Sequence, residues 1–343
     1  MFIAFEFVAV LLAIMFLGRA INLLVLMRWY RDPKSPGCAV DVDGRRVFYT
    51  LMGEGSPTVV IEGGLGTGSP EWWMLQQELA KTTRVLTYDR AGYGWSQQDL
   101  EPRTSEVIAS ELKELLDRLE IGGPLVLVGH SQGGLYVNHF CRLYPELVAG
   151  AVFVDPVSPD NIRFRQELSP RVYQRSGVDK ARILKFQSWL NGFGFMRLMK
   201  PWIVKSKPLL PYRGLPKSTL GILWNYMLLP HAPRTALSEY HESLDPRNST
   251  ALKALNTFPA VPLKVIAHAP EKMKQMIMEH GGLNAEEAAK VDELWQALIR
   301  SYCDLARTSS LTVATESGHN PHLEQQELVV QAILDIVTAA RAS

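Results

Sequence analysis

The sequence predicts an α/β fold in which helices cover both faces of a mostly parallel central sheet. Short apolar segments typical of buried strands alternate with segments of helical periodicity over most of the chain. Across residues 157–260 this alternation stops, and helical segments rich in large apolar residues replace it. Alternation resumes in residues 261–343. We therefore expect one core with a helical cap inserted before the penultimate strand.

The first part of the core is expected to span residues 39–156. In Thr104–Leu119, for example, apolar residues fall mostly on one helical face and charges fill the other. The expected strands are Val47–Leu51, Thr58–Ile61, Arg84–Tyr88, Pro124–Val128 and Gly150–Val154, and the other expected helices are Glu71–Lys81 and Leu135–Tyr144.

The second part of the core is expected to follow the cap. Repeated prolines divide the cap into short helices, and its position suggests that it lies over a site at the sheet edge. After it we expect strands at Val261–Ala267 and Leu311–Ala314 and helices at Glu286–Ala306 and Gln325–Ala340.

The N-terminal residues 1–30 predict a single-pass membrane anchor, joined by a linker at residues 31–38. Phe7–Leu17 is unbroken apolar sequence and Leu23–Met27 extends it, near the roughly 17–25 residues that a span requires. A cleaved signal peptide would need a basic start and a small-residue cleavage site, and neither is present. The alternative is a helix packed on the protein's own surface. By the positive-inside rule, the basic residues that follow the first apolar run lead us to expect the rest of the chain in the cytoplasm; these residues are Arg19, Arg28, Arg31 and Lys34.

Composition and motifs exclude several classes of function. The 343 residues carry a formal net charge of +1, which gives no support for nucleic-acid binding. Cys38, Cys141 and Cys303 are too widely spaced for a metal site or a disulfide framework. Gly63–Gly68 lacks the Lys-Ser/Thr of a phosphate-binding loop. We expect no metal and no cofactor.

The segment Gly129–Gly134, Gly-His-Ser-Gln-Gly-Gly, is the most informative motif. It follows a predicted strand and precedes a predicted helix, which is the context of a nucleophile elbow. Glycines allow the sharp turn that exposes the serine hydroxyl, so Ser131 is the candidate nucleophile. The alternative is an ordinary structural turn.

A base and an acid are required to activate the serine. His319 follows the last predicted strand, from which its loop can reach back over the elbow. Asp155 ends the strand after the elbow, and we favour it as the acid. Glu271, in the loop after the next strand, is the alternative acid. The chain order serine, acid, histidine is the one expected of this motif.

Two backbone N–H groups are expected to stabilise an oxyanion. The first belongs to Gln132, the residue after the nucleophile. The second is expected from the glycine-rich loop Glu62–Gly66, with Leu65 as the first choice and Gly64 as the second.

At this point residues 39–340 resemble the α/β-hydrolase superfamily, and in particular its cap-bearing, esterase- and lipase-like members. The segments that carry the resemblance are Gly129–Gly134, Glu62–Gly66, Tyr88–Ser96, Phe153–Pro156 and Ser317–His319. The resemblance implies the α/β-hydrolase fold. Two departures are Glu62, where many relatives have a His-Gly pair nearby, and the absence of an Asp after Ala267.

The resemblance also narrows the chemistry. Epoxide hydrolases and haloalkane dehalogenases use Asp at the elbow, so Ser131 disfavours both. We expect a serine hydrolase that cleaves a carboxylic ester through an acyl-enzyme on Ser131. The aromatic and methionine-rich cap favours a small apolar ester or lipid-like substrate. The alternatives are an acyltransferase, a thioesterase or a C–C hydrolase with the same triad, and a non-catalytic binding module.

Overall fold

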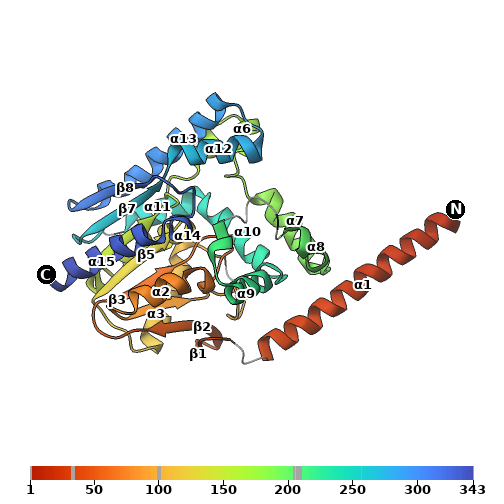
Figure 1. The fold of residues 1–343 in the computed structure, drawn as a ribbon, viewed down its shortest axis with the longest axis horizontal. Coiled ribbons are helices and arrows are strands. Elements are labelled where there is room, and N and C mark those ends of the chain that lie inside the picture. Colours follow the sequence, from red (N-terminus) through yellow and green to blue (C-terminus); the bar gives the residue numbers. More distant parts are fainter. Residues whose placement is uncertain are drawn as a thin grey trace.

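The computed structural model describes residues 2–31, 35–98, 102–203, 205, 211–255 and 257–342. Within them an eight-stranded sheet has the order β1-β2-β4-β3-β5-β6-β7-β8, with β1 and β2 antiparallel to their neighbours and the rest parallel (Figure 1). The strands are β1 Cys38–Val42, β2 Arg45–Met52, β3 Thr58–Glu62, β4 Val85–Tyr88, β5 Leu125–His130, β6 Val148–Val154, β7 Leu263–His268 and β8 Ser309–Ala314.

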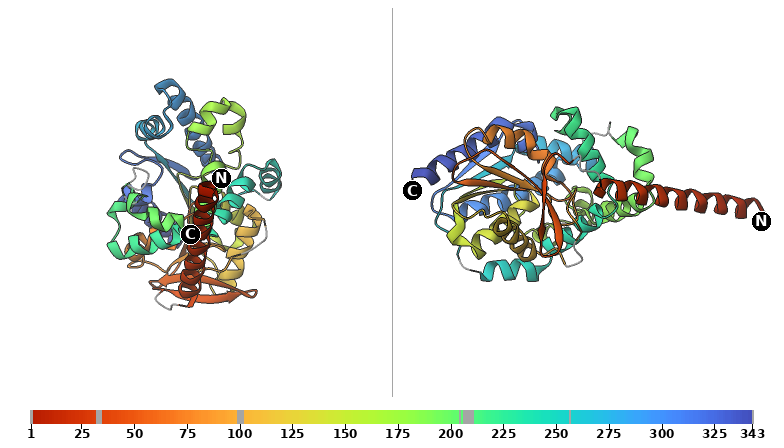
Figure 2. Two further views of the ribbon diagram at one scale, coloured as in Figure 1. Left: turned by 90° about the vertical axis from the view of Figure 1, so that its right-hand side faces the viewer. Right: turned by 90° about the horizontal axis from the view of Figure 1, so that it is seen from below.

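The central strands are buried because helices cover both faces of the sheet (Figure 2). One face packs against α3 and α4 through a cluster that includes Leu112 and Phe140. The opposite face packs against α2 and α15 through Leu75 and Ile333. The α-helices that follow α1 and lie outside the segment between β6 and β7 are α2 Trp73–Leu79, α3 Ser105–Arg118, α4 Gln132–Leu143, α12 Pro270–Gly281, α13 Ala285–Arg300, α14 Pro321–Glu324 and α15 Gln326–Ala342.

The expectation of a mostly parallel sheet flanked by helices is confirmed. The strand β1 and the helix α12 were not expected from the sequence. β1 is a short edge strand whose residues are mostly exposed or half-buried, so it lacks an apolar pattern. α12 begins with Pro270 at its first position, and its apolar residues are confined to Met273–Met278, too short a stretch to show a helical period.

The chain between β6 and β7 forms helices only, within the described residues. Helix α10 packs against α7, and the apolar cluster between them includes Leu184, Leu229, Ala236 and Tyr240. The helices of this segment are α5 Arg163–Glu167, α6 Pro170–Arg175, α7 Ala181–Gly192, α8 Phe195–Ile203, α9 Lys217–Met227, α10 Ala232–Ser243 and α11 Pro246–Ala254.

The expected membrane anchor is wrong. Residues Phe2–Arg31 form one helix, α1, but no helix in the described part of the chain has the length and apolarity needed to cross a membrane. The C-terminal half of α1 packs on the protein instead: Asn22 is buried and hydrogen-bonds to Asn191, and Trp29 stacks on Trp95 with ring centroids 4.8 Å apart. The expected membrane localisation is therefore corrected, together with the cytoplasmic placement that was argued from it.

Candidate active site

Ser131 lies in a strained turn between β5 and α4. Its backbone has φ 52° and ψ −119°, which a non-glycine residue rarely adopts. The neighbouring glycines are required sterically, because a Cβ on Gly129 would lie 2.7 Å from the Gly133 carbonyl oxygen, and one on Gly133 would lie 2.4 Å from the Glu62 carbonyl oxygen. The expected nucleophile therefore stands on a turn that this sequence can form only with glycine at both positions.

A continuous chain of hydrogen bonds joins Ser131, His319 and Asp155. His319 Nε2 lies 2.8 Å from Ser131 Oγ, and His319 Nδ1 lies 2.6 Å from Asp155 Oδ2. Since a carboxylate can only accept, Nδ1 carries the proton and Nε2 accepts from the serine hydroxyl. His319 is partly exposed, whereas Asp155 is fully buried.

The turn after β6 aims Asp155 at His319. Asp155 has φ +45°, and its N–H donates to the Ile266 carbonyl oxygen at 2.7 Å. Burial opposes its charge, but His268 and His319 outweigh burial and hold the pKa of this carboxyl well below its ordinary value. Glu271, the alternative acid, lies on the surface at the start of α12 and pairs with Lys274.

His130 supports the loop that carries His319. Its Nε2 lies 2.8 Å from the backbone oxygen of His319. Burial lowers the pKa of His130 well below its ordinary value, so the ring is neutral and Nε2–H is the donor.

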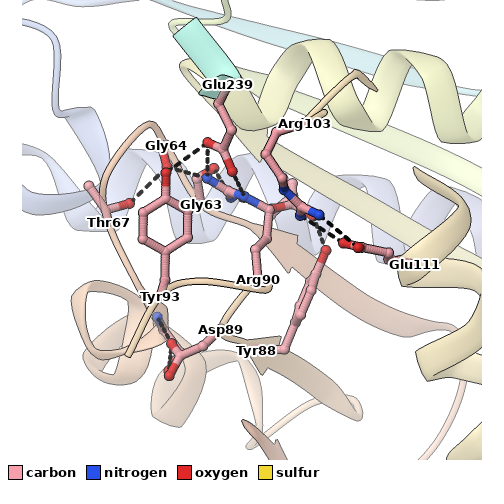
Figure 3. A network of polar contacts seen from close by, with 12 residues as sticks. Gly63, Gly64, Thr67, Tyr88, Asp89, Arg90, Tyr93, Arg103, Glu111 and Glu239 are labelled. Carbon is pink, nitrogen blue, oxygen red and sulfur yellow. Dashed lines mark hydrogen bonds and ion pairs between the residues drawn. The ribbon is translucent and has the colours of Figure 1, made fainter. Parts of the chain in front are cut away.

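The three residues expected to supply oxyanion donors, Gly64, Leu65 and Gln132, line one cavity together with Ser131 and His319. The guanidinium of Arg90 holds the glycine-rich loop in place by donating to two of its carbonyl oxygens. Its Nη1 donates to the Gly63 carbonyl oxygen at 2.8 Å, and its Nη2 donates to the Gly64 carbonyl oxygen at 2.7 Å (Figure 3).

Arg90 also connects two buried carboxylates. Its Nη1 lies 2.6 Å from Glu62 on β3, and its Nε and Nη2 each lie 3.0 Å from Glu239 on α10. The Tyr93 hydroxyl donates to Glu239 as well, at 3.0 Å (Figure 3). All three charged side chains are at least 96% buried, since the most exposed is Arg90 at 4%. This cluster joins the glycine-rich loop to the helical insert.

The cavity at Ser131 has a volume of about 350 Å³ and lies between the sheet edge and the helical insert. Aliphatic and aromatic side chains form much of its wall, as is usual for a small-molecule site. The large apolar residues among those lining it are Leu65, Val157, Phe164, Val178, Ile183, Leu184, Tyr212, Tyr240, Trp295 and Leu298.

Two residues near the site, His268 and Glu239, were assigned no role from the sequence. His268 bonds to Asp155, and its place at the end of β7, next to the strand that ends at Asp155, was the signal that could have found it. Glu239 carries no recognisable motif, because its partner Arg90 is 149 positions away in the chain.

A sequence model of the alpha/beta hydrolase family matches residues 59–332. An uncharacterized Bacillus subtilis protein, YbdG, is 27% identical over 168 residues, which cover 48% of this chain and 49% of YbdG. The chain thus spans about half the length of this relative.

Solved structures share the fold. An epoxide hydrolase from Bacillus megaterium superposes with a TM-score of 0.62 at 16% identity, over 88% of this chain and all of the other. A thermophilic esterase from Thermogutta terrifontis has a TM-score of 0.57 at 21% identity, over 89% and 97% of the two chains. With the family model matching most of its length, the chain belongs to the alpha/beta hydrolase family.

Proposed function

We propose that this protein is a serine hydrolase that cleaves a carboxylic ester through an acyl-enzyme on Ser131. The observation that carries the proposal is the hydrogen-bonded series Ser131–His319–Asp155, with distances of 2.8 and 2.6 Å. A serine activated by a histidine, which a buried carboxylate orients, is the arrangement that acyl transfer requires. Epoxide hydrolysis needs a carboxylate nucleophile, which Ser131 does not provide.

The proposed reaction has two halves. His319 Nε2 takes the proton from Ser131 as its Oγ attacks the ester carbonyl, and the resulting imidazolium gives that proton to the departing alcohol. A water molecule, deprotonated by His319, then attacks the acyl-serine, and the carboxylic acid leaves as Ser131 regains its proton. Asp155 stays anionic throughout and stabilises the imidazolium, which agrees with the low pKa of its carboxyl.

The tetrahedral oxyanion is proposed to bind the N–H groups of Gln132 and Leu65. In a trans peptide the C=O and N–H point in opposite directions. Because Arg90 and Thr67 both donate to the Gly64 carbonyl oxygen, the Leu65 N–H of that peptide faces away from them. Gly64 N–H is the second candidate. One such donor is worth about 2.7–4 kcal/mol of the barrier.

The proposed substrate is a small ester with an apolar acyl chain. A cavity of about 350 Å³ falls at the lower end of the range for small-molecule sites. Its apolar wall comes largely from residues 157–260, which we propose act as the cap of a core formed by residues 39–156 and 261–343. An acyltransferase, a thioesterase or a C–C hydrolase would use the same triad.

Hydrolysis of p-nitrophenyl esters from acetate to dodecanoate tests the proposal. The wild type is expected to prefer short to medium acyl chains, and Ser131→Ala is expected to lose at least about 10³-fold in kcat. Excess alcohol or amine acceptor distinguishes acyl transfer from hydrolysis. A folded wild type that cleaves no ester or thioester would contradict the proposal and favour the binding-module alternative.

A further inference from the structure

A second histidine, His268, binds the carboxylate oxygen of Asp155 that His319 does not contact. It ends β7 and is completely buried. Its Nδ1 lies 2.6 Å from Asp155 Oδ1, and its backbone N–H donates to the same oxygen at 3.0 Å. Its Nε2 lies 2.8 Å from Asp292 Oδ1, on α13. One imidazole thus bridges two carboxyl groups inside the protein.

Ionised carboxylates at both ring nitrogens require a doubly protonated ring, because a carboxylate oxygen only accepts hydrogen bonds and each nitrogen must then donate. Two further neighbours of the ring are uncharged: the Trp295 ring lies 5.6 Å away, and Gln296 donates to the His268 carbonyl oxygen. Lys274 on α12 interacts electrostatically with Asp292, but its ammonium group pairs with Glu271. Burial lowers the pKa of His268, but Asp155 and Asp292 outweigh it and raise the value to about 9.

Both hydrogen bonds from His268 go to the same oxygen of the Asp155 carboxylate. His268 occupies Oδ1 with two donors, which leaves Oδ2 for His319 alone. Rotation of the carboxylate would break these bonds, so the acceptor for His319 is held in one orientation. The backbone of Asp155 has a positive φ, and the same bonds help to stabilise it.

We propose that His268 is a positioning residue that fixes Asp155 as an oriented anion and, through its own positive charge, offsets the negative charge that Asp155 and Asp292 place beside the proposed triad. The proposal rests on the function proposed above, because it concerns the same triad. Asp292 accepts the hydrogen bond from His268 Nε2, and its negative charge partly cancels the positive charge of His268.

The charges make different predictions for two substitutions. His268→Gln leaves the carboxylates of Asp155 and Asp292 without the cation between them, so the proposed triad as a whole should take up a proton at higher pH. Asp292→Asn removes one negative charge and leaves an amide oxygen for His268 Nε2, so the proposed triad should take up a proton at lower pH, or at the same pH if His268 loses its own proton. A role confined to packing would produce no such difference.

The test is the pH profile of kcat/KM for ester hydrolysis. For His268→Gln we expect the acidic limb to move about one unit to higher pH, with a loss of at least about tenfold in kcat and little change in KM. For Asp292→Asn the limb is expected to move to lower pH or to stay. His139→Gln is the matched control, because His139 is equally buried but bonds to Ser105. Superimposable profiles for the wild type and His268→Gln would overturn the proposal.

A second measurement needs neither activity nor a variant that folds. In wild-type protein labelled with ¹⁵N-histidine, NMR at pH 7 is expected to show one buried imidazole with protons on both nitrogens, losing one near pH 9. Assignment follows from through-bond correlation to the His268 backbone. A His268 ring with a single proton at pH 7 would overturn the proposal, whereas a doubly protonated ring in a protein inert to all esters would refute only the proposed function.

Discussion

Replacing Arg90 by methionine tests how the buried cluster supports the proposed site. The substitution keeps an unbranched side chain but removes the cation that pairs with Glu62 and Glu239. Breaking one buried ion pair by removing a partner typically costs about 3–5 kcal/mol. Here two buried carboxylates lose their partner together, so we expect Arg90→Met to lower the free energy of unfolding by at least about 4 kcal/mol at pH 7.

The same substitution should impair the proposed chemistry. Without Arg90 the carbonyl groups of Gly63 and Gly64 lose two donors, and the loop that carries the Leu65 N–H is no longer fixed. If one oxyanion donor is lost, kcat falls about 10²–10³-fold. KM should change little, because the substrate's ground state does not depend on that donor.

The stability lost in Arg90→Met is expected to depend on pH in one direction. Burial raises the pKa of Glu62 in the folded protein, and Arg90 opposes the increase. In Arg90→Met this opposition is gone, so the folded-state pKa lies further above the unfolded value. Relative to the wild type, the variant is therefore most stable at low pH, below the pKa of Glu62 in the unfolded chain. It loses stability as pH rises through the pKa of Glu62 in the folded protein.

Urea unfolding monitored by tryptophan fluorescence between pH 4 and 8 measures these effects. Arg118→Met is the control, because Arg118 forms an exposed pair with Asp43 at 3.5 Å and its loss should cost less than about 1 kcal/mol. An Arg90→Met variant that loses less than 1 kcal/mol at pH 7, or that keeps wild-type kcat, would refute the reasoning.

Three further predictions follow from the geometry of the site. Asp155→Asn should lower kcat of ester hydrolysis about 10³–10⁴-fold with KM little changed, because an amide favours the wrong His319 tautomer; a smaller loss in steady-state kinetics would contradict this role. Gly133→Ala should cost at least about 1–3 kcal/mol in urea unfolding, since its Cβ would meet the Glu62 carbonyl oxygen at 2.4 Å; wild-type stability would contradict this. His268 has a raised pKa, so its stabilisation is complete below about pH 6.5 and lost as pH rises through about 9, and His268→Gln should flatten the wild-type stability profile in that window.

Local patterns were sufficient to predict the core of the fold. The strands β3 and β5 contain the apolar runs Val59–Ile61 and Leu125–Val128, each lying between a proline and a glycine, and the helix α3 carries a clear apolar face. The turn at Ser131 was predictable because glycine is obligatory on both sides of it for steric reasons. The docking of α1 was not predictable, because an apolar run gives no sign that Asn22 and Trp29 contact the rest of the protein.

The rest of the site depends on contacts between distant segments. Neither Asp155 nor Glu271 could be chosen firmly from the sequence, since the choice depends on which turn reaches His319. A role for Glu239 follows only from the structure, in which α10 places it beside Arg90. The position of His268 after a predicted strand could be seen in the sequence, but its protonation depends on two carboxylates from separate elements.

The most direct test of the central proposal is covalent labelling by a fluorophosphonate, followed by intact-mass measurement and peptide mapping. The account predicts one adduct, on Ser131, that forms faster with an apolar alkyl probe than with a charged one and is abolished in Ser131→Ala. An adduct on another residue, or a folded wild type that stays unlabelled, would contradict the assignment of Ser131 as a nucleophile activated by His319.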